Sequence, residues 1–442
     1  MCPCLLGVEG LVADELREMG AAQVTPENGR VVFDGSPELI ARANIRSRFA
    51  ERVLVLLGTF EAKNFESLFN GVKALPWTDW IGRDDAFPVK GRCLSSALMS
   101  VPDCQAIIKK AVVESLKETY RLERFPETGP LCQIQFLILK DQVSVMLDTS
   151  GAGLHKRGYR KHSNEAPIKE TLAAAMAKLS RVRTDGTLID PFCGSGTVTI
   201  EAALLAMHIA PGLRRHFAAE KWRTVPGAVW EAERRAAKAL ERRGEGFRAF
   251  AYDIDPEAVR LTLENAKKAG VAEFVTAEVR DIADFDGSGE YGCVICNPPY
   301  GERLLDVRAA EAIYQTMGRV FRPKRGWSYA VISPDERFET LFGRKADRRR
   351  KLYNGMIRCQ SERAAGRALR NRMRARLKAR PSCGARPKTR RRQRGNPFAG
   401  CLYHQPEGGK EKYSRVLHGA RKGVPRGARR GLCALPDAAR GP

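Results

Sequence analysis

The stretch TLIDPFCGSGTVTIEAALLA, residues 187–206, decides the predicted fold, because it has the pattern of a strand, a glycine-containing turn and a helix. The run TLID is typical of a short buried strand, and the helical pattern begins at Thr197. Gly194 and Gly196 in the turn would let the backbone approach a ligand closely. A Gly-x-Gly turn alone is equally typical of an ordinary tight connection between strand and helix, so both interpretations stay open at this point.

Three further strand ends downstream carry polar side chains suited to a nucleoside ligand. A charged helical insertion, about His208–Gly246, comes first, and a second strand then ends at Asp253, where an acidic residue can bind a ribose diol. A third strand ends at Asp281, placed to accept a hydrogen bond from an adenine amino group, and a fourth ends at Asn297. Because parallel strands bring their carboxyl ends to one edge of a sheet, we expect these side chains to lie together.

The ligand predicted for this edge is S-adenosylmethionine. The glycine turn lacks the Gly-x-Gly-x-x-Gly spacing, which disfavours a dinucleotide site. No Lys-Ser/Thr pair follows it, which disfavours a P-loop. An adenosine ligand without a pyrophosphate fits better, and S-adenosylmethionine is the obvious ligand of that kind.

The fourth strand runs into the segment VICNPPYGERL, residues 294–304, where two prolines end it. The side-chain oxygen of Asn297 and the backbone carbonyl of Pro298 form two fixed acceptors, which can bind both N–H bonds of an exocyclic amine and aim its lone pair at a methyl group. Tyr300 offers a ring face on which a flipped base can stack. In isolation this tetrapeptide is just as consistent with a plain turn. The three strand ends upstream favour the two-acceptor interpretation.

The rest of the chain divides into segments of different pattern. Residues 1–60 and 61–150 each mix helical and strand patterns, and residues 151–166 form a Gly-containing basic linker. Over residues 167–360, strands and helices alternate at the spacing of β-α-β units, which predicts a mostly parallel sheet with helices on both faces. We therefore expect an α/β domain preceded by a smaller α+β region.

The net charge of +25 is concentrated at the carboxyl end. Residues 361–442 carry 23 Lys and Arg against 4 Asp and Glu, whereas residues 1–360 carry 53 against 47. The basicity indicates a polyanionic partner, and the Arg-, Gly- and Pro-rich composition of the tail predicts disorder there. No apolar run approaches the ~20 residues of a membrane helix, and the chain does not begin with a secretory signal pattern. We expect a soluble, cytoplasmic protein.

Basic residues in two places are candidates for contact with RNA phosphates. One set lies on the helix predicted for residues 104–120, where a solvated helix face is an equally good interpretation. The other set lies in the linker, beside the predicted cofactor cleft, where Tyr159 could also stack on RNA. The candidates are Lys109, Lys110 and Lys117 on the helix, and Lys156, Arg157, Arg160 and Lys161 in the linker.

The cysteines and histidines do not form a metal-binding pattern. The 12 Cys lie mostly in apolar segments, without the dense spacing of a disulfide scaffold. Cys293 and Cys296 form a close pair, but no second pair lies at zinc spacing. His155 and His162 lack a set of metal-ligand partners, so no metal site is expected.

The sequence resembles a known group. Residues 187–300 are similar to the amino-group class of S-adenosylmethionine-dependent methyltransferases with an Asn-Pro-Pro-Tyr motif. Residues 147–180, LDTSGAGLHKRGYRKHSNEAPIKETLAAAMAKLS, and residues 350–360, RKLYNGMIRCQ, resemble the bacterial large-subunit rRNA guanine-N2 methyltransferases that carry a THUMP domain. With the pattern of the first 150 residues, the resemblance covers about residues 1–360.

The resemblance implies a Rossmann-like class I methyltransferase domain at residues 167–360. It implies a ferredoxin-like part at residues 1–60 and a THUMP RNA-binding domain at 61–150. By this resemblance Asp190, Gly194 and Gly196 would line the methionine part of the cofactor, Asp253 would bind its ribose and Asp281 its adenine, while Asn297, Pro298 and Tyr300 would hold the guanine, with Asn297 also bordering the cofactor.

The activity that the resemblance implies is methyl transfer from S-adenosylmethionine to N2 of a guanine in 23S rRNA, either free or in the assembling large ribosomal subunit. The alternatives are transfer to adenine N6 or to a protein glutamine amide, and a non-catalytic RNA-binding factor of ribosome assembly. The family has a short form and a long form fused to a second methyltransferase domain. The chain departs from the family pattern after Gln360, although RNRMRARLKA, residues 370–379, is faintly similar to the start of that second domain. Residues 361–442 are therefore interpreted as a genuine Arg-rich arm or as a reading-frame artefact.

Overall fold

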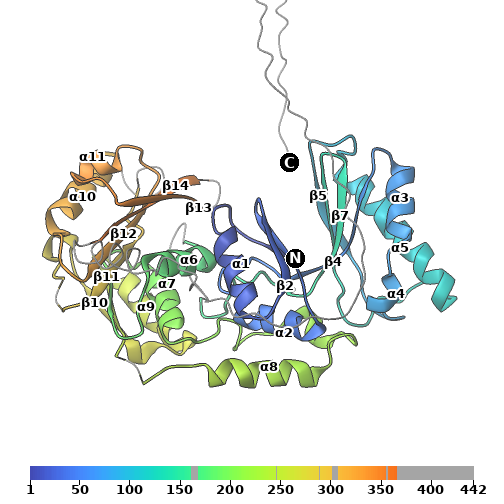
Figure 1. The fold of residues 1–442 in the computed structure, drawn as a ribbon, viewed down its shortest axis with the longest axis horizontal. Coiled ribbons are helices and arrows are strands. Elements are labelled where there is room, and N and C mark those ends of the chain that lie inside the picture. Colours follow the sequence, from blue (N-terminus) through green and yellow to red (C-terminus); the bar gives the residue numbers. More distant parts are fainter. Residues whose placement is uncertain (161–167, 245, 288, 301–306, 355–356, 366–442) are drawn as a thin grey trace, which may run out of the picture. The chain divides into compact units, whose positions relative to one another are not determined.

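The computed structural model describes residues 1–160, 168–244, 246–287, 289–300, 307–354 and 357–365. Its strands form three sheets, of three, four and seven strands, which succeed one another along the chain (Figure 1). Lys161, His162 and all residues from 366 onward lie outside the described residues, and with them most of the segment for which disorder is predicted.

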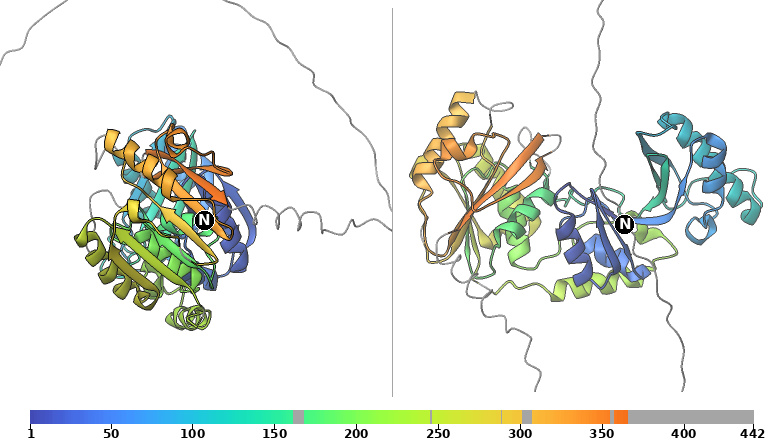
Figure 2. Two further views of the ribbon diagram at one scale, coloured as in Figure 1. Left: turned by 90° about the vertical axis from the view of Figure 1, so that its left-hand side faces the viewer. Right: turned by 45° about the horizontal axis from the view of Figure 1, so that its top comes forward.

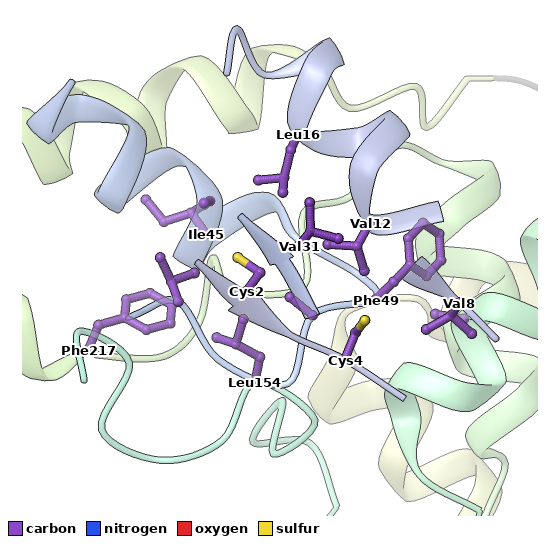
Figure 3. Close-up of a cluster of buried hydrophobic side chains, with 14 of the residues drawn as sticks. Cys2, Cys4, Val8, Val12, Leu16, Val31, Ile45, Phe49, Leu154 and Phe217 are labelled. Atoms are coloured by element: carbon purple, nitrogen blue, oxygen red, sulfur yellow. The ribbon is translucent and has the colours of Figure 1, made fainter. Parts of the chain in front are cut away.

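The first sheet has the strand order β1-β3-β2, with antiparallel neighbours. Leu16 from α1, Val31 from β3 and Ile45 from α2 are fully buried and meet in one apolar cluster (Figure 3). Helix α2 begins at Pro37, where a missing N–H costs nothing because the first turn has no acceptor for it. The elements are β1 Cys2–Pro3, α1 Glu9–Glu18, β2 Ala22–Glu27, β3 Arg30–Asp34 and α2 Pro37–Arg46.

The second sheet has the strand order β4-β7-β6-β5, in which only the β5–β6 pair is parallel. Strands β6 and β7 form a hairpin around Lys140 and Asp141, whose φ angles of 52° and 64° suit a two-residue turn that matches the twist of the strands. The elements are β4 Leu54–Glu61, α3 Phe65–Lys73, α4 Trp77–Trp80, β5 Val89–Leu94, α5 Val101–Tyr120, β6 Ile134–Leu139 and β7 Gln142–Asp148.

Strand β4 corrects the boundary predicted at residue 60. The sequence pattern placed this apolar run in the unit of residues 1–60, whereas the strand pairs with β7 from Leu54 to Glu61 and so belongs to the second sheet. The run itself predicts a strand, but its partner lies about ninety positions away, and an apolar pattern contains no information about which edge supplies the hydrogen bonds.

The third sheet has the strand order β10-β9-β8-β11-β12-β14-β13. The first five strands in this order pair with one another in parallel. Strand β14 is antiparallel to both β12 and β13. The mostly parallel α/β fold is thereby confirmed. The elements are α6 Glu170–Ser180, β8 Thr187–Asp190, α7 Thr197–Ala206, η1 Ala218–Lys221, α8 Gly227–Ala239, β9 Arg248–Asp253, α9 Pro256–Ala269, η2 Ala272–Phe274, β10 Val275–Val279, η3 Ile282–Asp284, β11 Gly292–Cys296, α10 Val307–Val320, β12 Trp327–Ser333, α11 Phe338–Phe342, β13 Arg348–Asn354 and β14 Ile357–Ala365.

Helices cover both faces of the third sheet, as the apolar strands predict. Leu188 of β8 packs in the cluster that contains residues of α6, α7 and α9, whereas the next residue, Ile189, packs in the cluster with α10 and α11. Figure 2 shows α10 and α11, in gold and orange, on one side of the strands and the green helices on the other. No helix in the described ranges combines the length and the apolar character that a bilayer span requires.

The chain order reverses between β8 and β11. From β8 the chain proceeds outward through β9 to β10, and then returns to the other side of β8 to form β11. A reversal of this kind opens a crevice beyond the carboxyl ends of the central strands, where open α/β sheets bind ligands.

The predicted helical insertion is present between β8 and β9 as η1 and α8, and it contacts both preceding regions. Glu233 of α8 accepts hydrogen bonds from Arg42 Nη2 at 2.6 Å and from Arg46 Nη2 at 3.2 Å, both on α2. Trp222 Nε1 donates to the carbonyl of Leu131 at 2.9 Å in the second region. The insertion therefore links the third region to the two that precede it.

We predict that Glu233→Gln destabilises the protein by about 1–3 kcal/mol, because two partly buried guanidinium groups lose their only shared carboxylate. Urea unfolding would measure the change. Glu231→Gln is the matched control on the same helix, because Glu231 and its partner Arg235 are each 74% exposed and 3.9 Å apart. Equal stability of the two variants would contradict the role given to Glu233.

Candidate active site

The predicted strand-end residues come together at the carboxyl edge of the third sheet. Strand β8 ends at Asp190 and the adjacent β9 at Asp253, and Asn297 directly follows β11 on the other side of β8. The backbone N–H of Gly194 donates to Asp253 Oδ2 at 2.9 Å, which ties the turn after β8 to the end of β9. Asp281 lies two residues beyond the end of β10.

The glycine turn leaves open space on one side and packs tightly on the other. Gly194 has a φ of 52°, and a Cβ added there would meet nothing within 4 Å. Gly196 has a φ of 79°, and a Cβ there would lie 2.8 Å from Cγ2 of Thr262 on α9. The side chains of Thr262 and Asn265 fix the turn, because they donate hydrogen bonds to the carbonyls of Gly194 and Ser195 at 3.1 and 2.9 Å. The two glycines thus permit a turn that is fixed on α9 and exposes its backbone.

Asp190 is a buried carboxyl group with few donors. It is 1% exposed and accepts hydrogen bonds from Thr199 Oγ1 at 3.2 Å and from the N–H of Phe192 at 3.4 Å. Burial raises the pKa of Asp190 to about 7, and the negative charge of Asp253 acts in the same direction. The group is therefore ready to ionise when a cation arrives beside it.

The other two acids differ in their surroundings. Burial raises the pKa of Asp253, although its carboxylate also accepts from the N–H groups of Gly194 and Asp255. Asp281 is exposed, and its Oδ1 accepts from the N–H of Ala283 at 2.7 Å, which starts η3. Each therefore has a fixed position and retains acceptor capacity for a ligand.

Asn297 carries an unsatisfied acceptor. Its Oδ1 is buried, and no described residue donates a hydrogen bond to it. A buried carbonyl oxygen without a donor costs about 1–3 kcal/mol, and a donor from a ligand or a water would remove that cost. Pro298, the next residue, is buried, and its ring restricts the backbone around the second predicted acceptor.

Sequence reasoning missed Asn354, which holds Tyr300 in place. Asn354 ends β13 and is 6% exposed, and its Nδ2 donates to the Tyr300 hydroxyl at 2.9 Å. The segment RKLYNGMIRCQ contains Asn354 and contributed to the family resemblance, but no local pattern indicates that its amide reaches a tyrosine 54 positions away.

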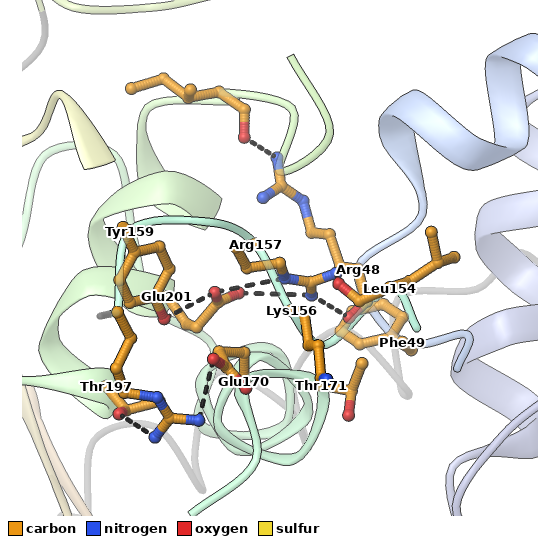
Figure 4. A network of polar contacts seen from close by, with 12 residues as sticks. Arg48, Phe49, Leu154, Lys156, Arg157, Tyr159, Glu170, Thr171, Thr197 and Glu201 are labelled. Carbon is orange, nitrogen blue, oxygen red and sulfur yellow. Dashed lines mark hydrogen bonds and ion pairs between the residues drawn. The ribbon is translucent and has the colours of Figure 1, made fainter. Parts of the chain in front are cut away.

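Two residues predicted to contact RNA are instead part of a buried polar network (Figure 4). Arg157 is 5% and Tyr159 4% exposed. Arg157 forms an ion pair with Glu201 of α7 at 3.4 Å and donates to the carbonyl of Arg48 at 2.6 Å, and the Tyr159 hydroxyl donates to Glu201 Oε1 at 3.1 Å. The structure does not support RNA contact by either side chain, because both are buried and bonded to Glu201.

The remaining described basic candidates are either exposed or paired. Lys117 is half-buried and pairs with Glu114 at 3.1 Å. Lys110 and Lys156 are exposed, as phosphate contact requires. Lys109 is paired with Glu127 at 2.5 Å and lies 3.4 Å from the ring centre of Phe87, which restricts it to a structural contact. Arg160 pairs with Glu170 at 2.9 Å and donates to Thr197 Oγ1 at 3.3 Å, so it connects the linker to the start of α7.

Comparison with known families matches three consecutive segments of the chain. Residues 157–363 match the model described as "RMKL-like, methyltransferase domain". Residues 1–54 match the "RlmL ferredoxin-like domain", and residues 62–148 match the "THUMP domain". The three matches follow the three sheets, and the gap between the first two coincides with β4.

The chain is also similar to whole proteins. It is 42% identical to YpsC of Bacillus subtilis (strain 168), named as a candidate RNA methyltransferase, over 80% of this chain and 92% of that protein. A predicted N6-adenine-specific DNA methylase from Listeria monocytogenes is 43% identical, with a TM-score of 0.79 over 83% of this chain and 95% of that one. SMU.472, a candidate methyltransferase solved with S-adenosylhomocysteine, is 40% identical, with a TM-score of 0.79 over 83% and 97% of the two chains.

We predict that Arg157→Ala lowers the free energy of unfolding by about 3–5 kcal/mol, because it leaves Glu201 as an uncompensated buried charge. Thermal and urea unfolding would measure the loss. The neighbouring Lys156→Ala is the control, and its exposed position predicts a change within about 0.5 kcal/mol. If the two variants unfolded at the same urea concentration, the network around Glu201 would not be the stabilising contact described above.

Proposed function

The chain belongs to the RMKL-like methyltransferase family, and we propose that it transfers a methyl group from S-adenosylmethionine to N2 of a guanine in 23S rRNA. The observation that carries the chemistry is the unsatisfied Oδ1 of Asn297 beside the candidate cofactor edge. RNA as the substrate is supported by the THUMP match and by the name of the Bacillus relative. Guanine N2 and 23S rRNA follow the resemblance of residues 147–180 and 350–360.

The residues at the carboxyl edge fit S-adenosylmethionine, which supplies an electrophilic methyl group on a sulfonium ion. Asp190 offers a carboxylate next to the open backbone of Gly194, suited to the cationic methionine part. Asp253 at the end of β9 would bind the ribose hydroxyls, and Asp281 beyond β10 would accept from the adenine amino group. Each carboxylate is placed by a backbone donor or by its strand, so little reorganisation is needed on binding.

Asn297 and Pro298 would activate the amine. The lone pair of an exocyclic amine is delocalised into its ring, so the amine is a poor nucleophile. Two acceptors on its two N–H bonds place electron density on nitrogen and fix the direction of the lone pair. Asn297 Oδ1 could accept one of these hydrogen bonds, because no described residue donates to it. The carbonyl of Pro298 would accept the other. The nitrogen would gain the methyl group as the methyl–sulfur bond of the sulfonium breaks, and it would then lose one proton to water, since Asn297 is neutral and takes none.

Tyr300 would give the base its orientation. A flipped base needs a flat apolar surface that does not move, and the hydrogen bond from Asn354 fixes the position of the Tyr300 hydroxyl. Asn354 is thereby a positioning residue, because it acts on the base through Tyr300. Because Asn354 lies on β13, its hydrogen bond connects Tyr300 to the edge strand of the third sheet.

A second candidate function is transfer to adenine N6, favoured by the name of the Listeria relative and by the same two-acceptor chemistry. Methyl transfer from labelled cofactor to total RNA and to DNA, followed by nucleoside analysis, separates the two. The proposal expects N2-methylguanosine in large-subunit rRNA, free or within an assembling ribosomal particle. Label only in N6-methyladenine, or in protein, would overturn the guanine assignment.

We predict that Asn297→Ala lowers turnover by about 10²-fold or more and leaves cofactor affinity nearly unchanged, since it removes an acceptor that acts on the amine. Single-turnover kinetics and calorimetric titration of the cofactor would measure the two effects. A variant with unchanged turnover would refute the two-acceptor role, whereas a loss confined to cofactor binding would reassign Asn297 to the cofactor.

We predict that cofactor affinity rises about tenfold between pH 6 and pH 8, because burial raises the pKa of Asp190 to about 7 and the ionised carboxylate favours a cationic ligand. Below this pKa the free protein holds a proton that binding must release. Titrations at several pH values would show the slope, and Asp190→Asn should remove it. A wild-type affinity that stayed constant over this range would place Asp190 away from the cationic part of the cofactor.

A further inference from the structure

A cavity of about 740 Å³ lies in the third region, bordered by the carboxyl-terminal ends of α7 and α9 and by one side of α8. We call it the rear cavity. Of its 17 lining residues, seven are Lys or Arg and one is acidic. Arg214, Arg235 and Lys268 are exposed among them. A concave surface with this excess of one charge attracts ligands of the opposite sign.

The rear cavity is distant from the candidate active site. The glycine turn precedes Thr197, the first residue of α7, and Asp253 precedes Pro256, the first residue of α9. The cavity is lined by residues at the opposite ends of these helices, Leu204 and Lys268. At about 1.5 Å per residue the two helices are roughly 15 and 21 Å long, so the cavity is not part of the cofactor edge.

Several of the lining cations are neutralised by carboxylates. Arg157 pairs with the buried Glu201, and Arg234 pairs with Glu220. Lys238 and Arg243 share Glu241 at 2.8 and 2.7 Å. These groups shape the cavity, but they contribute little net charge.

Three other cations supply the positive field. Arg214 Nη1 donates to the backbone carbonyl of Lys268 at 2.7 Å, and a carbonyl cancels no formal charge. Neither Arg214 nor Lys268 has a carboxylate partner within the described part of the chain. Among the described residues, Arg235 pairs with Glu231 at 3.9 Å, and both side chains are 74% exposed. These three side chains are therefore available to an anion.

Part of the cavity lining is apolar. Leu204, Ile209 and Ala210 line it and are buried, so a ligand would meet carbon atoms as well as guanidinium and ammonium groups. A nucleotide segment has this distribution, with an apolar sugar face and charged phosphate oxygens.

The helical insertion builds most of this surface. A crossover between the parallel strands β8 and β9 needs one helix, which α7 provides. The additional segment that includes α8 contributes Arg214, Arg235 and Lys238 to the cavity. The insertion thus adds a basic concave surface to the third region.

We propose that the rear cavity binds the phosphate backbone of the RNA substrate at a segment away from the target nucleotide. The inference rests on the proposed RNA substrate. Contact at two separated places would fix the register of the RNA, so that one nucleotide reaches Tyr300. The contacts carry no sequence information, because phosphates are the same at every position.

The test compares two neighbouring lysines on α9. Lys268 lines the rear cavity, whereas Lys267 is equally exposed but does not line it. The affinity of each variant for a large-subunit rRNA transcript is measured as a function of salt. Lys268→Ala should reduce the slope of log K against log salt by about 1, and Arg235→Ala with Lys268→Ala by about 2, while Lys267→Ala leaves it unchanged. Cofactor affinity should be unaltered in all variants.

A slope for Lys268→Ala equal to that for Lys267→Ala overturns the proposal. Binding of inorganic phosphate or adenosine monophosphate that depends on Lys268, without any change in the RNA slope, also overturns it and identifies a small-anion site. The binding measurement is independent of catalysis. If wild-type protein methylates no RNA, the proposed function fails, and the salt slopes still decide whether this cavity contacts a polyanion.

Discussion

Strand β8 pairs in parallel with β9 on one side and with β11 on the other, and this arrangement determines where the chemistry can occur. It places Asp190, Asp253 and Asn297 at one edge although together they span more than a hundred positions of the chain. The turn after β8 is then fixed by one backbone hydrogen bond to Asp253 and by two side chains of α9. The acceptors at this edge are held before any ligand arrives, which is the condition for effective electrostatic stabilisation.

Buried charge in this protein serves two different purposes. Around Glu201 the charges are paired, with Arg157 and Tyr159 both bonded to it, so the network joins the linker to α7 (Figure 4). At the carboxyl edge of the third sheet the polar groups are less completely paired. Asp190 accepts hydrogen bonds at 3.2 and 3.4 Å, and no described residue donates to Asn297 Oδ1. Satisfied polar groups stabilise a fold, whereas unsatisfied ones lower its stability and are retained where a ligand completes them.

The sequence predicted the features that depend on local pattern. The parallel sheet, the glycine turn and the insertion were recognisable because strand length, helix periodicity and turn residues are encoded within a few positions. Features that depend on distant partners were not recognisable. Arg157 and Tyr159 read as solvent-facing RNA contacts, because the burying partner Glu201 lies over 40 positions away. For the same reason the sequence did not predict the pairing of β4 with β7 or the contact of Asn354 with Tyr300.

The bond between Asn354 and Tyr300 has a consequence for shortened versions of the gene. A stop codon placed after α11 would keep the parallel strands and every carboxylate at their ends, yet it would delete the amide that anchors the tyrosine. Such an allele would encode a product in which the Tyr300 hydroxyl has lost its amide donor and β12 has lost its antiparallel neighbour β14.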